Sequence, residues 1–177
     1  GIRAPLWSRG LGDVYKRQVV PPSTSAKEIE ALKPDGIFLS NGPGDPKVLT
    51  SAVNEVKEMM KLEIPIFGIC LGHQIMSLAY DLKIEKMPFG HHGANHPVHD
   101  LKNNTVFITS QNHNFAVAEV EDRADISITH KSLFDGSIQG IEHCEKPFYS
   151  IQCHPEASPG PKEFEVLFER FFEDMNA

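Results

Sequence analysis

The 177-residue sequence predicts a single α/β domain, built on an open, mostly parallel sheet flanked by helices with an added antiparallel portion. Two short and continuously apolar runs, GIFLS at 36–40 and IPIFGI at 64–69, are typical of strands buried on both faces of a parallel sheet. A segment with helical periodicity separates them. Shorter strand-like segments with polar turns follow later in the chain and predict the antiparallel portion.

The other elements follow from local patterns. Ser25 and Glu28 have the spacing of a capping box, which predicts a short helix that ends near Leu32. Apolar residues between 49 and 60 recur with the period of a helix, and another helix is predicted from 71 to about 80. Four short strands and an amphipathic helix complete the chain: strands at 105–109, 126–129, 137–141 and 148–152, and a helix that carries Phe164, Leu167, Phe168 and Phe171.

Composition excludes several classes of function and location. The chain has 17 basic and 24 acidic residues, a net charge of −7, and no long basic tract, so no nucleic-acid partner is expected. No stretch approaches about 18 consecutive apolar residues, and the N-terminal residues lack the apolar core of a signal peptide. Three cysteines are too few for a disulfide framework. We therefore expect a cytoplasmic protein with no membrane partner.

Residues 1–18 differ from the rest of the chain. They hold four basic residues and one acidic residue, although the whole chain is acidic, and they show neither strand nor helix periodicity. Such a segment is typical of a cloning or assembly artefact. We therefore expect the domain to occupy residues 19–177 and to be truncated at its N-terminal side.

The clearest candidate for a catalytic residue is Cys70. In the sequence Gly68-Ile69-Cys70-Leu71-Gly72 it has the spacing of a nucleophile on a sharp strand-to-helix turn, where glycines allow close approach of the backbone. The start of a helix also favours a thiolate and supplies N–H donors for an oxyanion. A buried core cysteine is the alternative, but the strand, turn and helix around it favour a nucleophile.

A thiolate nucleophile needs a group that moves protons, and His154 with Glu156 can supply it. Both follow a predicted strand, and residues two apart at a strand end can point to the same side. Glu156 could then hold the imidazole tautomer that faces Cys70. The His-Pro-Glu motif alone is a weak signal, since a histidine at a strand end is more often a surface residue.

Two further motifs could indicate other chemistry. The turn Asn41-Gly42-Pro43-Gly44-Asp45-Pro46 can line a site beside the elbow, but it lacks the spacing of a phosphate-binding loop, so no nucleotide cofactor is expected. His91, His92, His96 and His99 lie close enough in sequence to suggest metal ligands. Because Gly90, Gly93 and Pro97 break any helix that would align them, we expect no metal there.

Together these segments resemble the class I, or triad, glutamine amidotransferases. GICLGHQ and HPE are motifs of the whole class, whereas FGHHGANHPV and HPEASPGP are similar to the small, glutamine-hydrolysing subunits of carbamoyl-phosphate synthases. The resemblance runs from about Val19 to the C-terminus. It implies the fold of that class and no cofactor.

The resemblance also implies roles for individual residues. Cys70 would attack the side-chain amide of L-glutamine to give a thioester and ammonia, with His154 as base and then acid and Glu156 orienting it. The backbone amides of Leu71 and Gly42 would stabilise the oxyanion. Further glutamine contacts would come from Gly44, Gln74, Asn112, Asn114 and Phe115.

The partner implied by the resemblance is a large synthetase subunit, which would use the ammonia to make carbamoyl phosphate for arginine and pyrimidine synthesis. Asn114 stands where many relatives have glycine, and we expect the site to tolerate the change, because asparagine accepts a left-handed conformation better than other residues with a side chain. Two alternatives stay open: an amidotransferase for another acceptor, as in anthranilate or GMP synthesis, which should lack FGHHGANHPV, and an inactive fragment that only docks to a synthetase.

Overall fold

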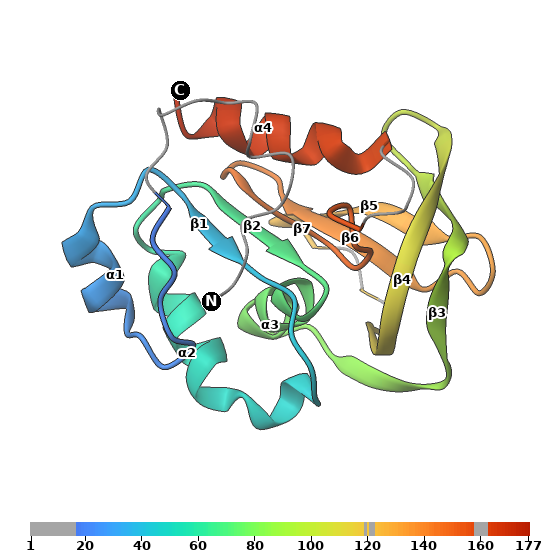
Figure 1. Ribbon diagram of the computed structural model, residues 1–177, viewed down its shortest axis with the longest axis horizontal. Helices are drawn as coiled ribbons and strands as arrows, with labels where there is room; N and C mark the ends of the chain where they lie inside the picture. Colours follow the sequence, from blue (N-terminus) through green and yellow to red (C-terminus); the bar gives the residue numbers. More distant parts are fainter. Residues whose placement is uncertain (1–16, 119, 121–122, 158–162) are drawn as a thin grey trace.

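The structure is a computed structural model that describes residues 17–118, 120, 123–157 and 163–177 (Figure 1). The expected foreign segment therefore lies almost wholly outside the described residues. In chain order the elements are α1 (Ala26–Leu32), β1 (Ile37–Leu39), η2 (Pro46–Val48), α2 (Thr50–Met59), β2 (Ile66–Ile69), α3 (Leu71–Ala79), β3 (Ile84–Asp100), β4 (Thr105–Val117), β5 (Ile126–Ser132), β6 (Ile138–His143), β7 (Phe148–Ile151), η3 (Glu163–Glu165) and α4 (Val166–Asp174). None of the helices in the described ranges is long and apolar enough to cross a membrane.

A parallel part of the sheet is formed by β1, β2 and β7. β2 lies in the middle, and both of its pairings are parallel. Neighbouring residues of β2 face opposite layers, because Ile66 packs into a core with α1, α2 and α3, whereas Phe67 packs with α4. Figure 1 shows these helices on the two sides of the strands. This part of the sheet agrees with the predicted parallel strands. At the start of α1, the predicted capping box of Ser25 and Glu28 is confirmed.

The second part of the sheet is antiparallel and closes on itself. The full strand order in the described residues is β1-β2-β7-β6-β4-β3-β5, and β5 also pairs with β6. The predicted antiparallel portion is present, since every pairing among β3, β4, β5, β6 and β7 is antiparallel. The prediction that the sheet is open and mostly parallel is wrong, because these pairings outnumber the parallel ones and β5 closes onto β6. Short turns such as residues 101–104 join these strands as hairpins, whereas a parallel pair needs a long crossover.

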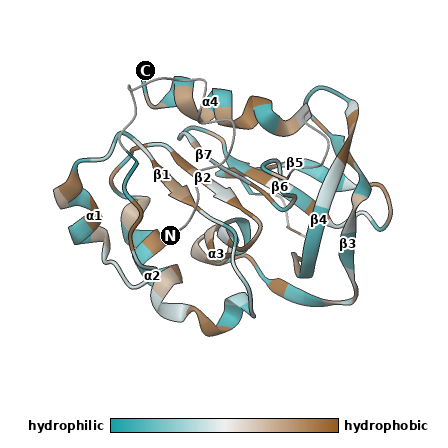
Figure 2. Cartoon of the chain, in the orientation of Figure 1, coloured by the Kyte–Doolittle hydropathy of each residue, from teal (hydrophilic) through white to brown (hydrophobic). Residues whose placement is uncertain are grey.

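The sequence analysis predicted no strand where β3 lies. This segment contains Pro88, Gly90, Gly93 and Pro97, which are uncommon within regular strands. Its pairing with β4 is interrupted twice, between Lys86 and His91 and between Gly93 and His96. Such irregularities bend a strand and increase its twist. Figure 2 shows hydrophilic residues along much of β4 and along parts of β3. Proline and glycine therefore mark the bends of a long strand rather than a loop.

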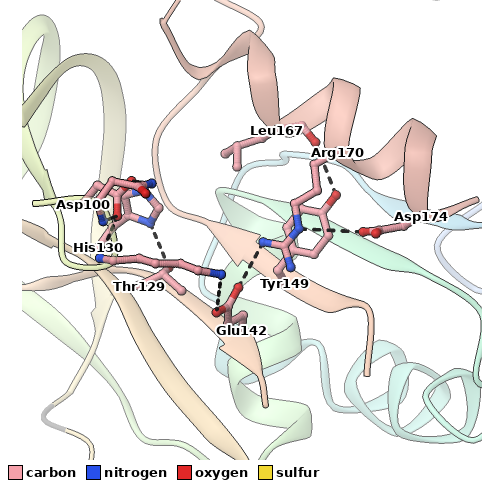
Figure 3. Close-up of polar contacts among 10 residues, drawn as sticks. Asp100, Thr129, His130, Glu142, Tyr149, Leu167, Arg170 and Asp174 are labelled. Carbon is pink, nitrogen blue, oxygen red and sulfur yellow. Dashed lines mark hydrogen bonds and ion pairs between the residues drawn. The ribbon is translucent and has the colours of Figure 1, made fainter. Parts of the chain in front are cut away.

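The last helix, α4, is held to the sheet by polar contacts (Figure 3). The Arg170 guanidinium lies 4.1 Å from the centre of the Tyr149 ring, and its Nη1 donates to Glu142 at 3.0 Å. The hydroxyl of Tyr149 in turn donates to the carbonyl of Leu167 at 3.3 Å. Tyr149 and Glu142 are partners in the pairing of β7 with β6. The helix is thereby fixed across β7, which leads directly into the segment that contains His154.

Candidate active site

Cys70 occupies a strained turn between β2 and α3. Its φ of 52° and ψ of −103° are unusual for a residue with a side chain, and such a conformation persists only where the surroundings enforce it. Its N–H donates to the carbonyl of Ile151 at 2.9 Å. A Cβ on Gly68 would collide with the backbone of Gly72, and one on Gly72 with the carbonyl of Leu39. The glycines at 68 and 72 therefore permit the sharp turn that their spacing around Cys70 predicts.

His154 and Glu156 follow β7 and contact each other. The Nδ1 of His154 donates to Glu156 Oε1 at 2.8 Å, and the backbone N–H of His154 donates to the carbonyl of Ser110 at 2.9 Å. The Cys70 side chain, and then Glu156, raise the pKa of His154 to about 10 against the opposing effect of burial. The other ring nitrogen, Nε2, is buried, and the Cys70 side chain is the group that acts on it. The imidazole is thus oriented by Glu156, with its second nitrogen left available.

A cavity of about 400 Å³ brings these side chains together with most of the other predicted site residues. Its lining residues are Asn41, Gly42, Pro43, Gly44, Cys70, Gln74, Asn112, His113, Asn114, Phe115 and His154. Two predicted residues do not line it. The Leu71 side chain packs against Gly42, and Glu156 contacts the site through His154. Segments far apart in the sequence therefore meet at the end of β2.

The far wall of the cavity comes from β4. Phe115 accepts two hydrogen bonds at its carbonyl, from Gln74 Nε2 at 3.0 Å and from His113 Nδ1 at 2.8 Å. Burial lowers the pKa of His113 to about 4, so this imidazole is neutral near pH 7, in contrast to His154. Asn114 is part of the extended strand and is not among the described residues with positive φ, so its backbone does not need the left-handed conformation that favours glycine.

The histidines of β3 have separate partners. His91 donates from Nε2 to Asp135 at 3.0 Å, and His99 Nε2 lies 3.0 Å from the amide oxygen of Asn104. The two ring nitrogens of His92 lie 2.9 and 3.2 Å from the side-chain oxygens of Asn112 and Asn114. Among the described residues, no group of three or more His, Cys, Asp or Glu side chains is arranged to hold a metal.

Sequence reasoning missed several residues around the cavity. Asn41, Pro43 and His113 line it, and Gln152 contacts Gln74 from behind the wall. Asn41 and Pro43 lie in the glycine turn that the sequence singled out, and His113 lies between two predicted contacts. Nothing in the sequence indicates that Gln152 reaches Gln74, since the contact joins residues 78 positions apart.

A larger cavity of about 580 Å³ lies elsewhere, between the start of β3, the end of β4 and the turn that follows β5. Its lining includes Met87, Phe89, His91 and Phe134 but none of the predicted site residues. The rings of His91 and His113, with centres 5.0 Å apart, lie between the two cavities. The smaller cavity is the candidate active site, because it contains the strained thiol and the oriented imidazole.

The fold and the site define an α/β protein with a cysteine on a strand-to-helix turn beside a histidine held by a carboxylate. Comparison with known proteins agrees with this class. A model of the family described as "Glutamine amidotransferase class-I" matches residues 8–174. The chain therefore belongs to the class-I glutamine amidotransferase family.

Individual relatives within this family share one name. The carbamoyl phosphate synthase small chain of Buchnera aphidicola is 57% identical over 157 residues, which cover 89% of this chain and 40% of the relative. The small chain of Escherichia coli K12 is 54% identical over 155 residues, with 88% and 41% covered. The chain thus spans about two fifths of the length of these curated relatives.

A solved structure shows the same fold at low sequence identity. A protein from Thermoplasma acidophilum, described as a putative component of GMP synthase, superimposes with a TM-score of 0.77 and 22% identity. The match covers 90% of this chain and 80% of that one. The fold is therefore shared with a protein whose name differs from that of the carbamoyl phosphate synthase small chains.

Proposed function

We propose that this chain hydrolyses glutamine to glutamate and ammonia through a cysteine thioester, and that the ammonia serves carbamoyl phosphate synthesis. The observation that carries the proposal is the cavity in which the strained Cys70 and the carboxylate-held His154 lie beside Gln74 and the β4 wall. Relatives that are more than half identical and are named carbamoyl phosphate synthase small chains support the acceptor reaction.

In the first step the thiolate of Cys70 attacks the side-chain carbonyl carbon of glutamine. A carbon–sulfur bond forms and, as the tetrahedral intermediate collapses, the carbon–nitrogen bond breaks. The leaving nitrogen needs a proton, and His154 supplies it as general acid. The raised pKa of His154 supports this role, because it keeps the imidazole protonated at neutral pH.

The negative oxygen of the intermediate needs donors that are already in place. We assign this to the backbone N–H groups of Leu71, at the first turn of α3, and of Gly42, in the turn after β1. The packing of the Leu71 side chain on Gly42 supports the assignment, since it brings the two backbone segments together. Gly44, Gln74, Asn112, Asn114 and Phe115 are proposed to contact the amino-acid end of glutamine.

In the second step water hydrolyses the thioester. His154, now neutral, takes a proton from water, the new carbon–oxygen bond forms, and the carbon–sulfur bond breaks to release glutamate and restore the Cys70 thiolate. Glu156 holds the imidazole in place throughout. We propose that the ammonia passes to a large synthetase chain, the partner that the name of the relatives implies.

The test is to replace Cys70 with alanine. Glutamine hydrolysis should fall to background, because only the splitting of the amide uses the thiol. In a complex reconstituted with the large chain of a close relative, synthesis from added ammonia should persist. Release of glutamate from glutamine is measured for both proteins.

Cys144→Ala is the matched control, because Cys144 is an exposed cysteine outside the cavity. Its activity should equal that of the wild type. Glutaminase activity that survives in Cys70→Ala would exclude Cys70 as the nucleophile. A wild-type chain that releases no glutamate, alone or in the complex, would instead favour the inactive fragment.

A further inference from the structure

The side-chain amide of Gln74 has both of its N–H groups engaged inside the protein. Nε2 donates to the carbonyl of Phe115 at 3.0 Å and to the side-chain oxygen of Gln152 at 3.1 Å. Gln74 lies in the first turn of α3 and is 3% exposed, yet it lines the cavity that contains Cys70. Its Oε1 accepts no hydrogen bond from the described residues, and this atom is not fully buried. Since Gln74 lines the cavity, the oxygen faces the cavity.

The orientation of this amide follows from what its partners can do. A backbone carbonyl only accepts hydrogen bonds, so the nitrogen of Gln74 must face Phe115. The second N–H then requires another acceptor on the same side, and the Gln152 oxygen supplies it. If either amide were turned over, two donors or two acceptors would face each other. Gln152 therefore fixes Gln74 with its oxygen toward the cavity.

Gln152 is itself held rigidly. It follows β7, is 0% exposed, and its backbone N–H donates to the carbonyl of Gln139 at 2.8 Å. Its own Nε2 is buried and has no hydrogen-bond partner among the described residues. A buried donor without a partner is unfavourable and calls for a reason. In Gln152 the side-chain oxygen faces Gln74, and this orientation leaves the side-chain nitrogen without an acceptor.

The exposed group that results is a neutral acceptor in the wall of an amino-acid site. An α-ammonium group carries only donors and needs acceptors, whereas an α-carboxylate needs donors. If Gln74 presented its nitrogen to the cavity, it would oppose an ammonium group. The orientation therefore matters for the amino-acid end of the substrate and not for the amide that is cleaved.

We propose that Gln152 is a positioning residue that sets the preference of the site for a substrate with an α-ammonium group, by holding the Gln74 oxygen toward it. The inference deepens the proposed function and rests on it. Gln152 touches neither the cavity nor the reacting atoms, so its effect passes entirely through Gln74.

The test compares Gln152→Met with the wild type on two substrates. One is L-glutamine, and the other is glutaramate, which is glutamine without its α-amino group. Methionine fills a similar volume but lacks the acceptor, which frees the Gln74 amide to turn. For glutamine, kcat/KM should fall roughly tenfold, chiefly through KM, as expected for a weakened hydrogen bond to a charged group. For glutaramate, kcat/KM should stay within about twofold, so the preference for glutamine falls.

The matched control is Gln139→Met. Gln139 is equally buried and accepts from Gln111 in the same region, but its side chain makes no described contact with Gln74. It should leave the ratio of the two substrates unchanged. If Gln152→Met does not fold, Gln152→Asn, which is too short by one methylene to reach Gln74, gives the same comparison.

Equal losses for glutamine and glutaramate in the Gln152 variant would overturn the inference, because they would indicate a general structural role. An unchanged glutamine KM would overturn it as well. These outcomes differ from failure of the proposed function, in which the wild type would hydrolyse neither substrate and Cys70 would have no measurable role.

Discussion

The parallel and antiparallel parts of the sheet bury different kinds of side chain. In β1 and β2 the buried side chains are apolar, such as Ile37, Ile66 and Phe67. The antiparallel strands bury imidazoles, amides and hydroxyls as well, including His91, His113, Thr109, Gln111 and Gln139. Many of these are paired across strands, as Gln111 is with Gln139 at 2.9 Å. The antiparallel part thus contains a buried polar network beside its own apolar cluster, whereas the buried side chains of β1 and β2 are apolar.

This difference corresponds to a division of labour in the candidate site. The parallel part provides the thiol and, after β7, the imidazole and carboxylate that the proposed chemistry needs. The antiparallel part provides the β4 wall of amides and carbonyls that, together with Gly44 and Gln74 from the parallel part, is proposed to recognise the substrate. Apolar layers on both faces of β2 hold the strained turn rigidly, and only polar groups fixed by hydrogen bonds can select an amino acid. The following variants test whether chemistry and recognition are separable in this way.

The largest effect is expected for His154→Asn, in the part assigned to chemistry. Asparagine cannot transfer a proton, so kcat for glutamine should fall by about 10³-fold, within the usual range for loss of a general acid and base. KM should change little, because recognition is assigned to the β4 wall, Gly44 and Gln74 and not to His154. Steady-state kinetics of glutamate release measures both. A rise in KM with little loss of kcat would contradict the division.

Glu156→Gln changes the partner of His154 and should have a smaller effect than His154→Asn. Glu156 raises the pKa of His154, after the larger contribution of Cys70, so its loss should lower that pKa from about 10. The protonated imidazole would then be lost at a lower pH, and the alkaline limb of the activity profile should move downward. The loss of kcat near pH 7 should be smaller than for His154→Asn. An unmoved alkaline limb would show that Glu156 does not act through His154.

A smaller effect, on stability, is expected for Gly72→Ala. A Cβ at this position would collide with the backbone carbonyl of Leu39, and backbone between packed layers cannot give way. The free energy of unfolding should fall by about 3 kcal/mol or more, which corresponds to a decrease of roughly 6–12 °C in Tm for a domain of this size. Thermal unfolding followed by circular dichroism measures it.

Gly136→Ala is the control in the antiparallel part. Gly136 has a φ of +73° but open space around its Cβ position. Its replacement should cost only the backbone strain of a left-handed residue, about 1–2 kcal/mol. A Gly136 variant as unstable as the Gly72 variant would show that the turn at Cys70 is no more constrained than an ordinary hairpin turn.

The same contrast explains what the sequence could predict. In the parallel part, short apolar runs and glycine spacing are local signals, and they located β1, β2, α3 and the turn at Cys70. In β3 the pattern is obscured by prolines, glycines and histidines whose partners lie on other strands. The closure of β5 onto β6 and the contact of Gln152 with Gln74 depend on pairings between distant residues. A single sequence carries no local trace of such pairings.

His92 has a local sequence signal and also contacts with distant residues. The sequence marks it as part of a histidine-rich segment, but its contacts are visible only in the structure. It lies opposite Asn112 in the pairing of β3 with β4, and its ring reaches both Asn112 and Asn114. Both asparagines line the cavity. An exposed histidine on β3 thus orients two amides of the wall.

The smallest effect is therefore expected for His92→Ala. Since the lost contacts are exposed, each contributes at the low end of the usual range for hydrogen bonds, and KM for glutamine should rise only about two- to fivefold. The value of kcat should be unchanged, because Cys70 and His154 keep their own partners. His99→Ala is the matched control, since His99 is a half-buried residue of β3 with an exposed contact to an asparagine, Asn104, and lies away from the cavity. An equal rise in KM for both variants would mean that β3 affects the site through its general stability. A fall in kcat confined to His92→Ala would mean that the antiparallel part contributes to the chemistry as well as to recognition.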